Sequence, residues 1–176
     1  MRRSQNPKGE KGQSLLEAAV AIPLLLTIAF NAMNLAYFWF VVLALSAAPR
    51  HGVQYSAQGG SAIEFSSAPP DTTLVSNVVF NNLTRAISGA TTSNVSVQVC
   101  SSSKGVDSGT HIAQCDTFGP GYSFPAPAAD PEIPLFVLHR VDAAYTVTPI
   151  IPGGLFNVVL PANLTFHRQV SMRSLY

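Results

Sequence analysis

The longest feature of the hydropathy pattern is an uncharged stretch near the N-terminus. From Ala18 to Ala48 there are 31 consecutive positions without Asp, Glu, Lys or Arg, and most of them are apolar. About 20 apolar residues are enough for a helix to cross the ~30 Å hydrocarbon core of a bilayer. The pattern therefore predicts one membrane-spanning helix over residues 13–48, which Pro49 is expected to end.

The charges on either side of this stretch predict its orientation. Four basic side chains precede the span and one follows it closely: Arg2, Arg3, Lys8, Lys11 and Arg50. By the positive-inside rule, this asymmetry places the N-terminus in the cytoplasm and the chain after residue 50 on the other side. An ordinary cleaved signal peptide is the alternative, because residues 44–48 include small residues suited to cleavage. Its apolar region, however, is normally only about 7–15 residues long.

Four positions inside the apolar stretch fall on one side of the helix. They are Pro23, Thr27, Asn31 and Asn34, spaced by three or four residues. Polar groups on one side of a membrane helix usually face another helix. The stripe therefore predicts helix–helix contacts, and the alternative is that these residues are tolerated without a specific partner.

A single carboxylate, Glu17, lies at the start of the apolar stretch. Acids within a membrane segment are costly and usually functional. Local chemistry offers another explanation, since Ser14 and Glu17 have the S-x-x-E spacing of a capping box at a helix start. Both interpretations of Glu17 stay open on these grounds alone.

The rest of the chain has the pattern of a small α+β domain, expected over residues 73–176 after a Ser-, Gly- and Pro-rich connector at 49–72. Helical spacing of Val75, Val79, Leu83 and Ile87 predicts a helix at 72–88. Alternating apolar positions predict strands at 94–99, 135–149 and 164–172, with loops over 103–134. We expect one helix packed on a three- or four-stranded antiparallel sheet.

Net charge is +1 and only 11% of residues are charged, so the composition does not indicate a nucleic-acid partner. Two cysteines, Cys100 and Cys115, flank a short loop. Outside the cytoplasm they are expected to form a disulfide. His111 raises the alternative of a zinc site, but such a site needs four ligands, and only three candidates cluster here.

Motifs for catalysis are weak. Ser101 and Lys104 form an S-x-x-K in a serine-rich turn, without the S-D-N and K-T-G partners of the penicillin-binding set. His139 falls on the apolar side of its strand and is expected to be a core histidine. We therefore expect neither an enzyme nor a cofactor.

The N-terminal pattern as a whole resembles a known family. A basic leader ends at Gly12, Glu17 is the fifth residue after that glycine, and an apolar helix follows. This resembles the class III leader of type IV prepilins. With Pro23 and the later Arg50, Gly52 and Tyr55, residues 9–58 resemble the TadE-like minor pseudopilins of tight-adherence (Tad) pili.

The resemblance implies cleavage between Gly12 and Gln13 by a prepilin peptidase, leaving residues 1–12 as a cytoplasmic leader. It also implies that Glu17 helps the subunit to assemble. The expected partners are membrane lipid, other pilins or pseudopilins, the assembly platform and the peptidase. The expected location is a bacterial inner membrane, with the C-terminal domain in the periplasm or outside the cell.

Two other functions fit the same sequence. One is a single-pass membrane anchor that carries an extracytoplasmic binding domain. The other is a secreted protein behind an ordinary signal peptide. The N-terminus of the mature chain separates the three hypotheses.

Overall fold

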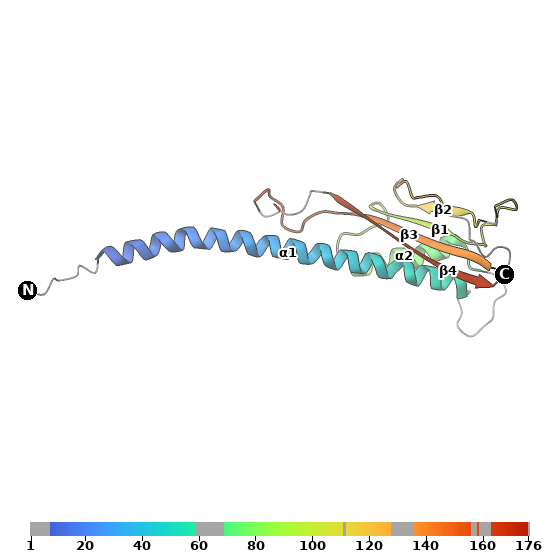
Figure 1. Cartoon of the computed structure of the whole chain (residues 1–176), viewed down its shortest axis with the longest axis horizontal. Helices are drawn as coiled ribbons and strands as arrows, with labels where there is room; N and C mark the ends of the chain where they lie inside the picture. The colour runs from blue at the N-terminus through green and yellow to red at the C-terminus, as the bar shows by residue number, and fades with distance from the viewer. Residues whose placement is uncertain are drawn as a thin grey trace, which may run out of the picture. The chain divides into compact units, whose positions relative to one another are not determined.

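The computed structural model describes residues 8–58, 69–110, 112–127, 136–155, 158 and 163–175. The elements are, in order, α1 (Lys8–Gln58), α2 (Thr72–Ala86), β1 (Val95–Cys100), β2 (Cys115–Phe118), β3 (Phe136–Val147) and β4 (Leu164–Leu175) (Figure 1). The chain divides into two compact units, which we describe separately. One comprises residues 1–38 and 148–162, and the other comprises residues 39–147 and 163–176, so α1 contributes to both.

The four strands form one antiparallel sheet in the order β2-β1-β3-β4 (Figure 1). β3 and β4 are its long strands and pair along their whole length, from Phe136 opposite Leu175 to Val147 opposite Leu164. The predicted α+β class is confirmed. β2 was not predicted, because it lies within the stretch 103–134 that was expected to be loop. Its four residues carry no clear apolar alternation, and pairing with β1 makes them a strand.

Helix α2 packs on the sheet with the stripe that its spacing predicts. The inward side chains of this stripe are fully buried: Val75, Val79, Leu83 and Ile87. The helix begins where Asp71 caps it, since the Asp71 carboxylate accepts a hydrogen bond of 2.8 Å from the Thr73 N–H. Hydrogen bonding lowers the pKa of the Asp71 carboxyl, and the bond from the Thr73 backbone N–H is the largest cause.

The second half of α1 belongs to the core of the same unit, and its expected end at Ala48 is wrong. The helix continues through Pro49 to Gln58, ten residues into the expected connector. A proline inside a helix costs one hydrogen bond and about 3 kcal/mol. Burial offsets this cost, because Leu45, Ala48 and Val53 are all buried on the side of the helix that faces the core. Residues 59–68 of the expected connector lie outside the described residues.

Gly52 explains how closely α1 approaches its neighbours. A Cβ at this position would lie 2.5 Å from Cγ2 of Val79 in α2 and 3.4 Å from Cγ1 of Val141 in β3. Valine side chains are stiff, so they cannot easily move away. The absence of a side chain at Gly52 therefore allows α1, α2 and the sheet to meet at one point.

The other face of the sheet is buried as well, under the segment 119–127. Ser96 of β1 donates a hydrogen bond to the Pro120 carbonyl. The turn that starts this segment requires Gly119, whose φ is +85° and whose Cβ would collide with the Val95 carbonyl oxygen. Cys100 lies on this face and is only 1% exposed.

Substitution of Gly52 tests the close approach. We expect Gly52→Leu to lower the free energy of unfolding by about 1–3 kcal/mol through overpacking, although leucine favours helix more than glycine does. Gln54→Leu is the matched control, because Gln54 is exposed on the same turn. Thermal unfolding of the detergent-purified chain measures both. Equal stability of the two variants would show that the contact with Val79 is not tight.

Candidate membrane anchor and assembly site

The first half of α1 presents an apolar surface that no other described residue of the chain covers. Every residue from Gln13 to Leu26 is exposed, and Glu17 is the only charged one among them. The large apolar side chains of this surface are more than two-fifths exposed: Leu15, Leu16, Val20, Ile22, Leu24, Leu25, Leu26 and Ile28. An apolar surface of this size is not stable in water. Within the described residues, α1 is the one helix long and apolar enough to span a membrane or to serve as a signal anchor.

Glu17 is not a helix cap in the intact chain. α1 begins at Lys8, so Ser14 and Glu17 lie inside the helix and the capping-box explanation is wrong. Instead, Nε2 of Gln13 donates a hydrogen bond of 3.1 Å to Oε1 of Glu17, one turn along the helix. The bond between Gly12 and Gln13, where cleavage is expected, is also inside α1. Glu17 is therefore exposed, with a neutral partner, at the start of the apolar surface.

The predicted polar stripe is occupied by contacts within the chain. The Thr27 hydroxyl donates a hydrogen bond of 2.9 Å to the Pro23 carbonyl, the preceding turn of the same helix. Such back-bonding satisfies a hydroxyl in an apolar surrounding without any second helix. Contacts of Pro23 and Thr27 with a neighbouring helix stay a prediction.

Asn31 and Asn34 bind a distant part of the chain, the apolar segment after β3. The Asn34 side chain is 1% exposed and pairs with both backbone groups of Ile151. Its Nδ2 donates to the Ile151 carbonyl and its Oδ1 accepts from the Ile151 N–H, each at 3.1 Å. The Asn31 amide group donates to the Leu155 carbonyl at 3.1 Å and accepts from the Val158 N–H at 3.0 Å. The sequence predicted helix–helix contacts for these two residues and did not indicate this segment.

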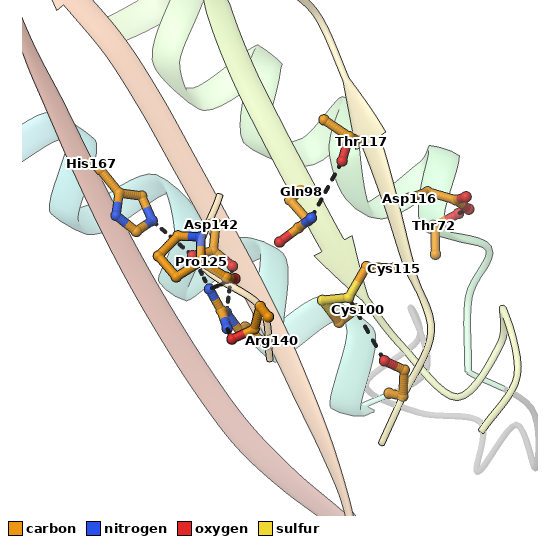
Figure 2. Close-up of a disulfide and its surroundings, with 12 residues drawn as sticks. Thr72, Gln98, Cys100, Cys115, Asp116, Thr117, Pro125, Arg140, Asp142 and His167 are labelled. Carbon is orange, nitrogen blue, oxygen red and sulfur yellow. Dashed lines mark hydrogen bonds and ion pairs between the residues drawn. A yellow bond between two sulfur atoms is a disulfide. The ribbon is translucent and has the colours of Figure 1, made fainter. Parts of the chain in front are cut away.

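Cys100 and Cys115 form the predicted disulfide (Figure 2). They lie directly opposite each other on β1 and β2, with their Cα atoms 4.0 Å apart. The bond ties the four-residue β2 to the sheet. The zinc alternative has no support: no cluster of three or more His, Cys, Asp or Glu side chains occurs among the described residues, and His111 lies outside them.

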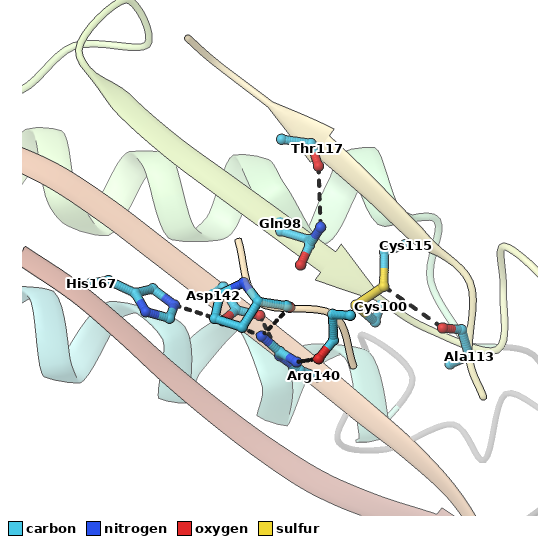
Figure 3. Close-up of polar contacts among 10 residues, drawn as sticks. Gln98, Cys100, Ala113, Cys115, Thr117, Arg140, Asp142 and His167 are labelled. Carbon is cyan, nitrogen blue, oxygen red and sulfur yellow. Dashed lines mark hydrogen bonds and ion pairs between the residues drawn. A yellow bond between two sulfur atoms is a disulfide. The ribbon is translucent and has the colours of Figure 1, made fainter. Parts of the chain in front are cut away.

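A buried charged cluster on the second face of the sheet was not predicted. The Arg140 and Asp142 side chains are 4% and 0% exposed and form two hydrogen-bonded contacts of 2.6 and 2.8 Å (Figure 3). Nε2 of His167 lies 2.7 Å from Oδ1, the same carboxylate oxygen that accepts the hydrogen bond from Nη2 of Arg140. Two further guanidinium donors bond to the carbonyls of Pro125 and Ala126, at 2.9 and 3.2 Å.

This cluster fastens the segment 119–127 to the sheet. The rings of Tyr122 and Phe124 pack around the His167 ring, with centroid distances of 5.9 and 5.6 Å. The signal in the sequence was the spacing of Arg140 and Asp142, two residues apart in a mostly apolar strand, which puts them on one face. A polar face of a strand usually meets water, so nothing in the spacing alone indicated burial.

His139 is the core histidine that the strand pattern predicts. It is 1% exposed, with Nδ1 2.7 Å from the Ser56 hydroxyl and Nε2 3.5 Å from the Ser102 hydroxyl. Burial lowers the pKa of His139 to about 4, so the ring is neutral at physiological pH. This arrangement joins the last turn of α1 to β3 through hydrogen bonds between uncharged groups.

The S-x-x-K motif forms structural contacts. The Ser101 hydroxyl is fully buried and accepts a hydrogen bond from Ser56. Nζ of Lys104 lies 2.9 Å from Oδ1 of Asp116, and this hydrogen bond raises the pKa of Lys104 and lowers that of Asp116. A lysine with a raised pKa is a poor general base at neutral pH.

Replacement of Asp142 tests the buried cluster. We expect Asp142→Asn to lower the free energy of unfolding by about 3–5 kcal/mol, because it leaves the Arg140 charge buried and unpaired. Asp116→Asn is the matched control. It removes a partly exposed ion pair worth about 0–1 kcal/mol. Denaturant titration of the full chain in detergent gives both values, and similar losses for the two variants would contradict the assignment.

Comparison with protein-family models, curated proteins and solved structures finds no match to this chain, so its family stays a prediction from the residues of its N-terminal half.

Proposed function

We propose that the chain is a membrane-anchored minor pseudopilin, processed by a prepilin peptidase, that assists assembly or priming of a Tad-type pilus. The observation that carries the proposal is the spacing of Gly12, Gln13 and Glu17 at the start of a helix surface that is otherwise uncharged and uncovered. A prepilin helix is stored in the bilayer and later packs against other helices. Both states require a long apolar surface that the subunit itself leaves free.

The carboxylate of Glu17 supports the proposal because a charge in an apolar helix is energetically costly and needs a compensating partner. A charge at the edge of an apolar helix is favourable only where a cationic group compensates it. Cleavage after Gly12 would create such a group, the terminal amine of Gln13, on the same subunit or on a neighbour. In the intact chain the Gln13 side chain gives Glu17 a neutral hydrogen bond only.

A single-pass membrane anchor with an outer binding domain is the second candidate. The observation in its favour is that the amides of Asn31 and Asn34 bind the backbone of their own chain. A helix of this kind needs no partner helix at these two positions. The two candidates differ in whether residues 1–12 are removed.

Cleavage is the first test. We expect the chain, co-expressed with a prepilin peptidase and extracted from membranes, to begin at Gln13, as measured by intact mass. Gly12→Leu is expected to keep residues 1–12, because the peptidase cuts after glycine in the family that this N-terminus resembles. Retention of residues 1–12 in the unchanged chain would favour the plain anchor, and a start near Ala47 would favour an ordinary signal peptide.

The charge of Glu17 is the second test. Glu17→Gln keeps an acceptor for Gln13 Nε2 but removes the charge, whereas Glu17→Ala removes both. We expect each variant to be inserted and cleaved. The amount that co-purifies with its pilin partners is expected to fall roughly tenfold, which corresponds to a loss of about 1.4 kcal/mol in the free energy of association. Asp116→Asn, which removes a charge far along the chain, is the control. Normal co-purification of the Glu17→Gln variant would show that a neutral hydrogen bond is sufficient and would remove the main support for the pseudopilin.

A further inference from the structure

The segment that Asn31 and Asn34 bind is itself strongly apolar. No Asp, Glu, Lys or Arg occurs between Asp142 and Arg168. Ile150, Leu155 and Val158 are 61%, 72% and 70% exposed. Three large apolar side chains, exposed to this extent on an uncharged segment, form a surface that needs an apolar environment.

If α1 spans a bilayer, the positions of Asn31 and Asn34 along the helix define the depth in the membrane of the segment that they bind. Seventeen residues separate Glu17 from Asn34, and fourteen separate it from Asn31. At 1.5 Å per residue these separations are about 26 and 21 Å along the helix axis. Both are shorter than the ~30 Å hydrocarbon core. With Glu17 at one edge of this core, the bound segment lies in the opposite leaflet.

A non-helical backbone at that depth is tolerated only where its polar groups have partners. The asparagine side chains supply four: the N–H and carbonyl of Ile151, the Leu155 carbonyl and the Val158 N–H. Pro149 and Pro152 have no N–H group, so these two positions have no backbone donor to satisfy. The segment therefore combines exposed apolar side chains with a backbone whose polar groups are partly paired or absent.

We propose that residues 148–155, together with Val158, form a second membrane-contacting element, with Ile150, Leu155 and Val158 bound to phospholipid acyl chains of the leaflet opposite Glu17. Asn31 and Asn34 hold it there as positioning residues. The proposal rests on the membrane-spanning role of α1 and adds a lipid contact from the C-terminal half of the chain. Lipid is a more suitable occupant than a protein groove, because the surface continues an exposed apolar helix and carries no charge.

Quenching of tryptophan fluorescence by lipid tests the proposal. The chain has one tryptophan, so Trp39→Phe gives a background into which single tryptophans are introduced by Leu155→Trp, Leu25→Trp or Leu74→Trp. The full chain is reconstituted in phosphatidylethanolamine and phosphatidylglycerol vesicles whose acyl chains are brominated near their middle. Leu25 lies on the first half of α1 and is the reference for membrane insertion. Leu74, 50% exposed on α2, is the matched apolar control.

We expect bromolipid to quench the Leu155→Trp variant at least about half as strongly as the Leu25→Trp variant, and to leave the Leu74→Trp variant almost unquenched. Adding Asn34→Leu to the Leu155→Trp variant is expected to reduce its quenching roughly twofold, because the Ile151 backbone loses its partners. The same addition to the Leu25→Trp variant is expected to change nothing.

The outcomes separate this proposal from the membrane span on which it rests. Absence of quenching in the Leu25→Trp variant would overturn the span itself. Quenching of that variant without quenching of the Leu155→Trp variant would overturn only the second contact. Protection of the Leu155→Trp variant from both bromolipid and aqueous iodide would assign the surface to a protein partner, such as a second copy, and would also overturn it. Unchanged quenching after Asn34→Leu would remove the positioning role of the asparagine.

Discussion

The apolar surface of α1 has to be covered along its whole length, and the rest of the molecule depends on how this is done. From about Val41 to Ser56 the cover comes from within the chain, where α2 and the sheet bury one side of the helix. From Gln13 to Leu26 the part of the chain that the structure describes provides no such cover. One continuous helix thus serves two environments, and each requires a different pattern of side chains. Small and β-branched residues suit the close packing at Gly52, whereas long apolar residues suit lipid or another helix.

The compact unit that contains the sheet, residues 39–147 and 163–176, closes its two sheet faces by different physical means. On the face toward α2, valines of β1 and β3 meet the helices in ordinary apolar packing. On the other face, a disulfide holds β2, and the Arg140–Asp142–His167 cluster holds the segment 119–127. A covalent bond and fully paired charges are effective where a loop has little apolar surface to bury. They also make this face sensitive to the loss of a single partner, because an unpaired buried charge is far more costly than an exposed one.

The contacts of Asn31 and Asn34 show that polar residues of a long apolar helix can find partners within their own chain. Polar groups in a membrane helix need partners, and a neighbouring helix is only one source of them. Here the backbone of the segment after β3 takes that role, with each amide both donating and accepting. This arrangement links the N-terminal helix to a segment more than a hundred residues later in the chain. It places an uncharged, exposed surface beside the helix, as the proposed lipid contact requires.

The sequence alone determined the elements with strong periodicity. The apolar stretch of α1, the stripe of α2 and the alternation of β1, β3 and β4 each follow from local patterns, because burying one face imposes a period on the chain. The disulfide was also predictable, since two cysteines on either side of a short loop leave few alternatives. The resemblance of the N-terminus to prepilins depends on spacing only, and the fold does not test it.

Only the tertiary structure decided the features that depend on contacts between distant residues. Pro49 predicted the end of a helix, but packing around Gly52 and Val53 extends α1 to Gln58. The capping box at Ser14 had the right spacing, yet the helix begins earlier, at Lys8. Arg140 and Asp142 had the pattern of a solvent-exposed face and are buried beneath a loop. In each case the local pattern was present in the sequence. Its structural outcome depended on contacts with residues elsewhere in the chain, and a local sequence pattern does not specify those contacts.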